Sequence, residues 1–474
     1  MMRIVEVIAV PGVGAYYNED LEALQARPIP LGDRYTTEPV TPGFRHVREV
    51  AEALSVGLVL EDASAGAGPL QIAWGDCVGV AYSGKAGRDP VFRAEEGAAI
   101  IQGIVAPALL GRTLGGFREL AADIDALIES APPPEPEPDP DAPPETLTRR
   151  DLLTSPVSVL RAIREELEQS TAPPKPPAPQ PAKPAHTALR YGVSQALLQA
   201  VALSKGVTMA EVISEEWGLP LPDQPVPIHA QSGSEFYHNA DKMIARRVAS
   251  LPHILVDNIQ VQLGSDGGKL TQYVRWLKKR LDDLGGPDYL PTIHLDVHGA
   301  LGKVCQNNLG KVFGKLYGLE TAAKPYPLRV ESPVIMDTRE EQIKAMRRLR
   351  EYVRTRNDMS LKLVVDEWAN TLDDIWAFVN AMSVDMVQIK MPNLGGVHNT
   401  IEAVAKCKYG GVMPFLGGSC AETDVSARVA VHVALATRPE MILARPGMGV
   451  DEAVSLVQNE MARTLAWIKL RRGR

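Results

Sequence analysis

The 474-residue chain is 45% hydrophobic and carries a formal net charge of −8, from 58 acidic and 50 basic residues. A chain of this length can bury a large core and form two domains, one of them a barrel of about 250 residues. The charges are spread along the sequence without a basic stripe, so the composition argues against nucleic acid or a membrane surface as partner and favours a small molecule.

Cellular location and redox state are indicated by two further features. No uninterrupted apolar stretch approaches the roughly 18 residues that suggest a membrane span, and MMRIVEVIAVPG at the amino terminus lacks the cleavage site of a secretory signal. The four cysteines lie far apart without a CxxC pair, at Cys77, Cys305, Cys407 and Cys420. We therefore expect a cytoplasmic protein with reduced thiols, because this spacing fits neither a disulfide framework nor a zinc ribbon.

The first 130 residues mix two periodicities. Alternating runs at 3–10, 56–62 and 72–82 predict strands, and the runs at 95–111 and 117–130 predict helices, as in an α+β domain. The composition then changes, because proline dominates about 131–186 in tracts that favour extended polyproline II. Residues 155–170 predict one short amphipathic helix between these tracts. We interpret the segment as a tolerated surface insertion, with a docking element for a partner as the alternative.

A different rhythm follows a long predicted helix at 190–206. Eight strand candidates, mostly separated by helical segments, lie at 227–233, 253–262, 292–299, 328–333, 361–367, 385–391, 412–418 and 441–447. This alternation favours a parallel sheet closed into a (β/α) barrel, with a doubly wound open sheet as the alternative. The predicted fold class is α/β, with an amino-terminal α+β capping domain at 1–218 and a (β/α)8-like barrel with a final helix at 219–474.

Polar residues stand where four successive predicted strands end. Asp296 closes TIHLD, Glu331 closes LRVE, Asp366 closes LVVD and Lys390 closes MVQIK. Because the active sites of barrels lie at the carboxyl ends of the strands, these side chains should meet at one rim. Three converging carboxylates repel one another unless a hard cation binds them, so the sequence predicts a site for Mg2+, with Mn2+ possible. A single acid at such a position could merely cap the next helix.

The amine of Lys390 ends an otherwise apolar strand. A nearby divalent cation and partial burial disfavour the protonated amine, so Lys390 can act as a base. Removing a proton next to a carboxylate also requires the developing enediolate to be stabilised, which a coordinated metal can do. A snorkelling or salt-bridged lysine is the alternative reading.

The motifs VPIHAQSG, SLPHILVDN, IHLDV, LRVESP, LVVDEW, VQIKMPNLGG, GGSCAET and ARPGMGVDE resemble the 3-methylaspartate ammonia-lyase family of the enolase superfamily. The resemblance extends to RIVEVIAVPG, YSGKAGRDPVF and RYGVSQALLQAV and leaves only the proline-rich segment outside. It implies a Mg2+-dependent carbon–nitrogen lyase, often stimulated by K+, that reversibly eliminates ammonia from (2S,3S)-3-methylaspartate to give mesaconate. It also implies an amino-dicarboxylate substrate and a homodimer whose amino-terminal domain covers the barrel mouth.

The resemblance also assigns roles to individual residues. Asp296, Glu331 and Asp366 match the magnesium ligands, and Lys390 matches the base that removes the C3 proton of the threo substrate. His253 matches a histidine on the opposite face, which binds the substrate and can be the base for the other diastereomer. From the sequence alone, a histidine at a strand start is more often structural.

Further residues match groups around the substrate. Gln388 shares the inward direction of Lys390 by strand alternation. Gln231, Ser419 and Cys420 match groups that hold the other carboxylate, with the glycines of LGGSC allowing close backbone approach. Cys420 need not be a nucleophile. His294 should also face inward, more as a packed or supporting group than as a reacting one.

Three positions depart from the family pattern and put the substrate in doubt. Ala81 stands where the family has a glutamine near the substrate amino group. His229 replaces a phenylalanine, and Phe415 replaces a tyrosine, in the pocket around the methyl group, whereas Leu443 keeps the aliphatic wall. A substituted amine or a polar C3 substituent is therefore an alternative, although one methylene is worth only about 1–3 kcal/mol in such a pocket.

Two other functional classes compete with the lyase. A dehydratase or epimerase of the same superfamily would normally show a KxK pair on an early barrel strand, and HILVDNIQVQ has none. A non-catalytic barrel scaffold would use the proline-rich segment as its working part. The intact acids and Lys390 argue against the scaffold.

Overall fold

The computed structural model describes residues 2–27, 29–62, 69–129, 185–233, 235–254, 256, 258–444 and 446–473. Its amino-terminal part is built on an antiparallel sheet of β1 (Met2–Glu19), β2 (Arg48–Asp62) and β3 (Gln71–Val78), in the order β1-β2-β3. The helix predicted at 155–170 lies outside the described residues.

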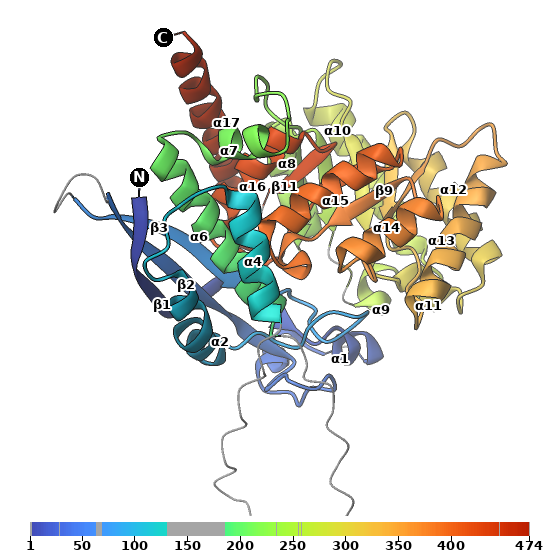
Figure 1. Ribbon diagram of the computed structural model, residues 1–474. Coiled ribbons are helices and arrows are strands. Elements are labelled where there is room, and N and C mark those ends of the chain that lie inside the picture. Colours follow the sequence, from blue (N-terminus) through green and yellow to red (C-terminus); the bar gives the residue numbers. More distant parts are fainter. Residues whose placement is uncertain are drawn as a thin grey trace, which may run out of the picture. The chain divides into compact units, whose positions relative to one another are not determined.

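The sheet is covered on one face by a long helix. Alternate residues of β2 are fully buried, as the period of a strand requires: Leu54, Val56, Leu58 and Leu60. Figure 1 shows α4 (Phe117–Glu129) and α6 (Thr187–Lys205) lying across the sheet. The α6 backbone comes so close to β3 that a Cβ on Gly75 would stand 2.1 Å from the carbonyl oxygen of Gly192. Both positions therefore require glycine.

Short helical segments complete this part of the chain. The helix predicted at 95–111 forms with a π-helical turn in its middle, as α2 (Ala94–Ile100), η2 (Ile101–Val105) and α3 (Ala106–Leu109). The others are α1 (Leu21–Ala26), η1 (Leu31–Tyr35) and α7 (Met209–Glu216). None of the described helices is alone long and apolar enough to cross a membrane; α6 and α7 reach that hydropathy only as a pair bent by 92°.

The carboxyl-terminal part is a closed barrel of eight parallel strands, so the predicted barrel is confirmed and the open sheet is excluded. The strands are β4 (Ile228–Gly233), β5 (Ser250–Ile254), β6 (Thr292–Asp296), β7 (Leu328–Glu331), β8 (Lys362–Val365), β9 (Met386–Ile389), β10 (Met413–Leu416) and β11 (Met441–Ala444). They follow one another in chain order, and β11 pairs with β4 to close the barrel.

Helices surround the barrel, as Figure 1 shows. They are α8 (Phe236–Ala245), α9 (Ile259–Gln262), α10 (Gly268–Leu284), α11 (Ala300–Val304), α12 (Leu309–Ala323), α13 (Arg339–Arg354), α14 (Leu372–Asn380), η4 (Met391–Leu394), α15 (Val397–Tyr409), α16 (Asp424–Thr437), η5 (Pro446–Met448) and α17 (Val450–Arg472). Side-chain caps begin several of them; Thr371 and Thr423, for example, each form a capping box that satisfies amides in the first turn of α14 or α16.

One strand prediction was wrong. The strand expected at 253–262 lies instead at Ser250–Ile254, and Ile259–Gln262 forms the short helix α9. The Asn258 side chain accepts a hydrogen bond from the Val261 amide, so the polar residues after the strand cap a helix and do not extend the sheet. His253 consequently lies near the carboxyl end of β5 and not at a strand start.

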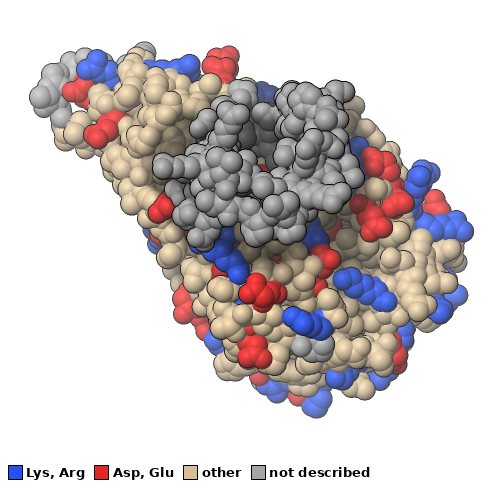
Figure 2. Space-filling model, turned by 90° about the horizontal axis from the view of Figure 1, so that it is seen from below, with Lys and Arg blue, Asp and Glu red and all other residues tan. Residues whose placement is uncertain are grey.

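Polar and charged contacts join the two parts at the carboxyl ends of the barrel strands. The Ala15 amide donates to the Ala421 carbonyl over 3.2 Å, and the Asn370 side chain donates to the Ala86 carbonyl over 2.7 Å. The contact of Ala86 places the loop at 79–88 against the barrel rim, where the candidate site is found. On the face shown in Figure 2, basic and acidic side chains of the described residues are interspersed.

Candidate active site

The four polar residues of the strand ends lie together at the barrel rim. Asp296 and Glu331 are the last residues of β6 and β7, and Asp366 and Lys390 directly follow β8 and β9. The three carboxylates are at most 1% exposed. Lys390 Nζ donates to Asp366 Oδ2 over 2.7 Å. His253 Nε2 lies 3.6 Å from Asp296 Oδ2 and 3.5 Å from Glu331 Oε2, so a histidine stands between the other two acids.

Asp296 lies where negative charge accumulates. Burial raises the pKa of Asp296 well above its usual value, and three neighbouring carboxylates add to the shift. His298 offers partial compensation, because its Nε2 lies 3.0 Å from Asp296 Oδ2 and its amide donates to Oδ1 over 3.1 Å. A carboxylate in this position gains stability from any added positive charge.

Glu331 has more partners than Asp296. Gln388 donates to its Oε1, and His294 Nε2 lies 2.8 Å from its Oε2. Burial alone would raise the pKa of Glu331, but His253, whose Nε2 is 3.5 Å away, and the charge of Lys390 hold it below the usual value. Glu331 is therefore ionised at neutral pH and held in a fixed orientation.

Two cations compensate Asp366. Arg88, from the amino-terminal part, donates to Asp366 Oδ2 over 2.8 Å and lies 3.6 Å from Glu367 Oε1. Burial would raise the pKa of Asp366, but Lys390 and Arg88 hold it below its usual value. The pKa of Glu367 is raised by burial and by the charge of Asp366. Glu367 also accepts a hydrogen bond from Ser332.

Backbone strain accompanies the acids. Three residues that follow them adopt positive φ angles without being glycine: His298 at 44°, Ser332 at 46° and Trp368 at 67°. This conformation is uncommon for residues with a Cβ and is often found at functional sites, where the surrounding structure maintains it. The chain thus turns sharply after β6, β7 and β8, which leaves the acidic side chains at the rim.

A pocket opens above the acids, between the strand ends and the loop at 79–88. It is lined by Val80, Ala81, Tyr82, Gln231, His253, Asp296, His298, Gln388, Lys390, Gly418, Ser419, Cys420 and Leu443. Of the residues expected to contact a substrate, the lining includes Ala81, Gln231, Gln388, Ser419, Cys420 and Leu443. The backbone at Gly417 approaches closely, because a Cβ there would stand 2.6 Å from Gln388 Cγ.

His229 and Phe415 do not line this pocket. Both are fully buried inside the barrel, where the His229 ring lies 5.3 Å from that of Phe415 and 5.2 Å from that of His253. Any influence on substrate choice would therefore pass through His253. His294 is buried beside them, and burial lowers the pKa values of His229 and His294 well below the usual range, so both rings are neutral.

Cys420 lines the pocket as a neutral thiol. Burial raises the pKa of Cys420 to about 12, and its Sγ lies 3.9 Å from Gln231 Oε1. A group that stays protonated can donate a weak hydrogen bond but is a poor nucleophile. This agrees with the expectation that Cys420 need not react.

The sequence reasoning missed four residues of the site. Glu367 directly follows Asp366, Arg88 lies in the motif YSGKAGRDPVF, and His298 precedes a glycine two positions after Asp296. Tyr82 packs edge-on against His298, with ring centres 5.1 Å apart. Glu367, Tyr82 and Arg88 stand in the quoted motifs and His298 in the predicted strand at 292–299, but their contacts with the acids are visible only in the folded protein.

The donor set fits a hard divalent cation. Four buried carboxylates gather around two fixed cations, Arg88 and Lys390, so negative charge is in excess at the rim. Oδ1 of Asp366 is buried without a hydrogen-bond partner. Carboxylate oxygens of this kind are the ligands that Mg2+ and Mn2+ prefer.

Comparison with known proteins covers the whole chain. Residues 2–133 and 145–218 match the family described as methylaspartate ammonia-lyase N-terminus, and residues 220–470 match its C-terminus. The chain is 41% identical to methylaspartate ammonia-lyase 2 of Carboxydothermus hydrogenoformans, with 100% of both chains covered. It is 37% identical to methylaspartate ammonia-lyase of Clostridium tetanomorphum, over 99% of this chain and 100% of the relative.

Solved structures agree with the sequence comparisons. A Mg complex of β-methylaspartase from Clostridium tetanomorphum superposes with a TM-score of 0.79 at 37% identity, covering 99% of this chain and all of that one. The Citrobacter amalonaticus enzyme containing (2S,3S)-3-methylaspartic acid gives 0.81 at 36% identity, covering 98% and 100%. An L-Ala-D/L-Glu epimerase from Bacillus subtilis gives 0.56 at 14% identity, over 95% of this chain and 92% of that one, and shares the fold alone.

A capped eight-stranded barrel with acids on successive strand ends facing a lysine is an enolase-like fold. Within that class, the chain belongs to the methylaspartate ammonia-lyase family and is thereby a carbon–nitrogen lyase.

Proposed function

We propose that this protein eliminates ammonia from L-threo-3-methylaspartate to give mesaconate, in a reversible reaction that requires Mg2+. The observation that carries the proposal is the position of Lys390. Its Nζ donates a hydrogen bond to Asp366 and lies at a pocket that Asp296 and His253 also line. The relative from Citrobacter amalonaticus was solved with (2S,3S)-3-methylaspartic acid and the one from Clostridium tetanomorphum as a Mg complex.

Asp296, Glu331 and Asp366 would hold the cation. Mg2+ fits them best because all three offer hard oxygen donors, and Mn2+ has the same preference. When bound, the cation supplies Lewis-acid stabilisation of the negative charge that develops on the substrate carboxylate as the proton leaves, a contribution of several kcal/mol. K+ as an activator remains a prediction from the family resemblance.

Lys390 is the proposed base for C3. Its Nζ lies on the pocket wall, 12% of its side chain is exposed, and its hydrogen bond to Asp366 fixes its direction. With a divalent cation bound beside it, the protonated form of the amine is disfavoured, and the neutral amine would accept the C3 proton. Gln388, two residues earlier on the strand, points to the same side and orients Glu331. General-base catalysis of this kind contributes about 10²- to 10⁴-fold to the rate.

Other pocket residues would position the substrate. His253 lines the pocket and contacts the Asp296 and Glu331 carboxylates, so it can bind the substrate and serve as base for the other diastereomer. Gln231, Ser419 and the neutral thiol of Cys420 offer donors to the second substrate carboxylate. Leu443 supplies an aliphatic wall, and the small Ala81 leaves room beside it for a larger amine or C3 substituent.

A spectroscopic assay tests the proposal. Purified full-length protein with Mg2+ and K+ is mixed with threo-3-methylaspartate, and the ultraviolet absorbance of the unsaturated dicarboxylate is followed. We expect mesaconate to form, and the rate to fall to background when a chelator removes the divalent cation. If no 3-substituted or N-substituted aspartate yields an unsaturated dicarboxylate under these conditions, the proposed function is wrong.

A further inference from the structure

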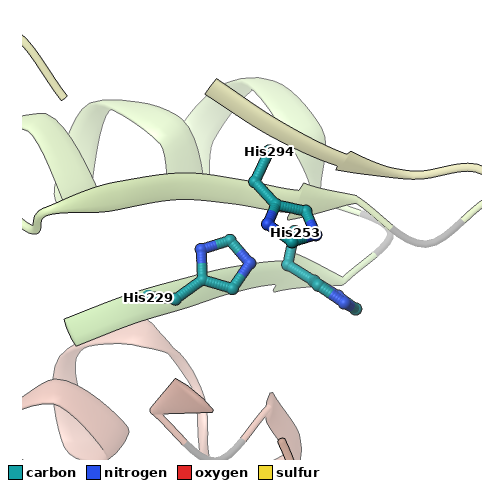
Figure 3. Close-up of side chains that lie close together, drawn as sticks. All are labelled: His229, His253 and His294. Atoms are coloured by element: carbon teal, nitrogen blue, oxygen red, sulfur yellow. The ribbon is translucent and has the colours of Figure 1, made fainter. Parts of the chain in front are cut away.

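Three histidines meet inside the barrel, beneath the pocket. His229, His253 and His294 come from the adjacent strands β4, β5 and β6, and each places a ring nitrogen within 4.8 Å of the others. Figure 3 shows the rings of His229 and His294 facing each other, with His253 beside them. The ring centres of His229 and His294 are 4.5 Å apart, and those of His229 and His253 are 5.2 Å apart.

These rings have unused binding capacity. His229 and His294 are fully buried and His253 is 4% exposed. Both ring nitrogens of His229, and Nδ1 of both His253 and His294, have no hydrogen-bond partner. Nε2 of His253 faces the carboxylates of Asp296 and Glu331 at 3.6 and 3.5 Å. The Ser250 backbone lies near the His229 ring but makes no hydrogen bond of normal geometry with it. Leaving a buried donor or acceptor unsatisfied costs about 1–3 kcal/mol, so packing alone does not explain three imidazoles here.

The contact of His294 with Glu331 determines which ring nitrogen of His294 is protonated. Nε2 of His294 lies 2.8 Å from Glu331 Oε2, so this nitrogen carries the proton and donates to the carboxylate. Nδ1 then bears a lone pair without a partner. A carboxylate that fixes the far nitrogen of an imidazole in this way is the usual support of a metal-binding histidine.

We propose that His229, His253 and His294 form a second metal site, which binds a borderline transition-metal cation such as Zn2+, Ni2+ or Co2+ through one nitrogen each. Imidazole suits these metals, and three histidines with one open position are a known zinc ligand set. Bond lengths of about 2.0–2.1 Å in tetrahedral geometry place ligand nitrogens roughly 3.3 Å apart. The ring nitrogens lie within 4.8 Å of one another, so the rings would move toward the ion as it binds.

The second site shares a residue with the pocket. His253 belongs both to this trio and to a group with Asp296 and Glu331 whose potential ligand atoms are also within 4.8 Å of one another. A cation held by the histidines engages His253 and removes it from the pocket wall. Transition metals should therefore inhibit the enzyme even at saturating Mg2+, because Mg2+ does not compete for nitrogen ligands.

Metal binding to the intact protein tests the site without an activity assay. Full-length protein is saturated with Mg2+ and dialysed against Co2+, and bound cobalt is measured together with its visible absorption. We expect one Co2+ per chain with the spectrum of nitrogen ligation. His229→Phe, which keeps an aromatic ring, should weaken binding by about a hundredfold or more, because loss of a ligand exceeds the 10- to 100-fold loss typical of a supporting group.

A matched control removes a different buried imidazole. His398 is 9% exposed and lies on α15, with Nε2 3.8 Å from Asp125 Oδ2. His398→Gln should bind Co2+ as the wild type does. Unchanged affinity in His229→Phe, or no tight binding to the wild type, overturns the proposal.

A measurement on the wild-type protein tests the site even if the His229→Phe variant does not fold. Electron paramagnetic resonance of one equivalent of Cu2+, added to the Mg2+-loaded protein, should show hyperfine coupling to three imidazole nitrogens. A spectrum with oxygen ligands alone contradicts the proposal.

An activity arm, which rests on the proposed lyase function, locates the inhibition. Zn2+ at saturating Mg2+ should inhibit the wild type, and His229→Phe should require about a hundredfold more Zn2+. Equal inhibition of both proteins places Zn2+ at the carboxylates and contradicts the proposal. Absence of any lyase activity would count against the proposed function and leave the binding experiments decisive for this site.

Discussion

Nη2 of Arg88 lies 2.8 Å from Oδ2 of Asp366, and both side chains are at most 2% exposed. An arginine of the amino-terminal part therefore compensates a buried acid of the barrel. Arg88→Gln should lower the free energy of unfolding by about 3–5 kcal/mol at neutral pH without divalent cation, because Asp366 and Glu367 lose a buried partner. Urea denaturation of the metal-free protein measures the change.

A surface arginine provides the control for that measurement. Arg356 pairs with Asp358 over 2.9 Å, but both side chains are nearly half exposed. Arg356→Gln should change the free energy of unfolding far less than Arg88→Gln does, because solvent screens the exposed pair. If Arg88→Gln is as mild as this control, the buried contact is not the link that we describe.

Lys390→Ala separates catalysis from metal binding. The variant should lose threo turnover by at least about 10²-fold, because the base is gone. Its affinity for Mg2+ should stay nearly unchanged, because the acids remain. Isothermal titration with Mg2+ and the absorbance assay give the two values, and a large loss of Mg2+ affinity would contradict the role assigned to Lys390.

Ala81→Gln tests the pocket wall contributed by the loop at 79–88. Ala81 is 8% exposed and faces the space beside Gln231 and Leu443. A larger side chain should reduce kcat/KM for N-substituted aspartates about 10- to 200-fold relative to the unsubstituted amine. Substrate profiles of both proteins check this, and identical profiles would show that the amine does not lie near residue 81.

The thiols should react slowly with alkylating reagents. Burial raises the pKa values of Cys407 and Cys420 to about 12, so roughly one thiol in 10,000 is ionised at pH 8. Modification by iodoacetamide should be at least about a hundredfold slower than for free cysteine. Mass spectrometry follows the reaction, with the urea-unfolded protein as the rapidly labelled control. Fast labelling of Cys420 in the folded protein would argue for a reactive thiolate.

Glu460 of α17 makes folding stability depend on acid. The pKa of Glu460 is lowered to about 2, chiefly by its hydrogen bond to His432. Burial opposes this shift, and contacts with Arg463 and Arg428 add to it. The carboxylate therefore stabilises the fold above pH 4.5, and this contribution disappears as the pH falls toward 2. Glu460→Gln should cost roughly 2–3 kcal/mol at pH 7 and little at pH 2.5. Urea midpoints at both pH values test the trend, and a cost that does not depend on pH would refute it.

Much of the barrel could be predicted from the sequence because its signals are local. Seven of the eight predicted strands contain the observed strands, and Asp296, Glu331 and Asp366 mark the ends of three of them. The error at 253–262 arose because an apolar run with polar residues reads equally well as a strand or as a strand followed by a capped helix. In the structure, Asn258 caps the helix by accepting a hydrogen bond from the Val261 amide. That contact depends on the folded backbone, so it is not visible in the sequence.

The candidate site was less accessible from the sequence. Strand alternation and strand ends indicate which side chains of one strand face inward, but not which parts of the chain meet. Arg88 and Tyr82 reach the rim from the amino-terminal part, and His298 reaches Asp296 through a backbone turn with positive φ. Likewise, the family resemblance placed His229 in the pocket around the methyl group, whereas the structure places it beneath the pocket and not in its wall.

The loop at 79–88 holds both Ala81, on the pocket wall, and Arg88, on the buried acid. One short loop thus contains a residue that can change substrate choice, Ala81, and a residue that balances the charge of a buried barrel acid, Arg88. Engineering of new substrates should therefore change single residues near 81, since exchanging the whole loop with that of a relative would succeed only where the arginine is carried along.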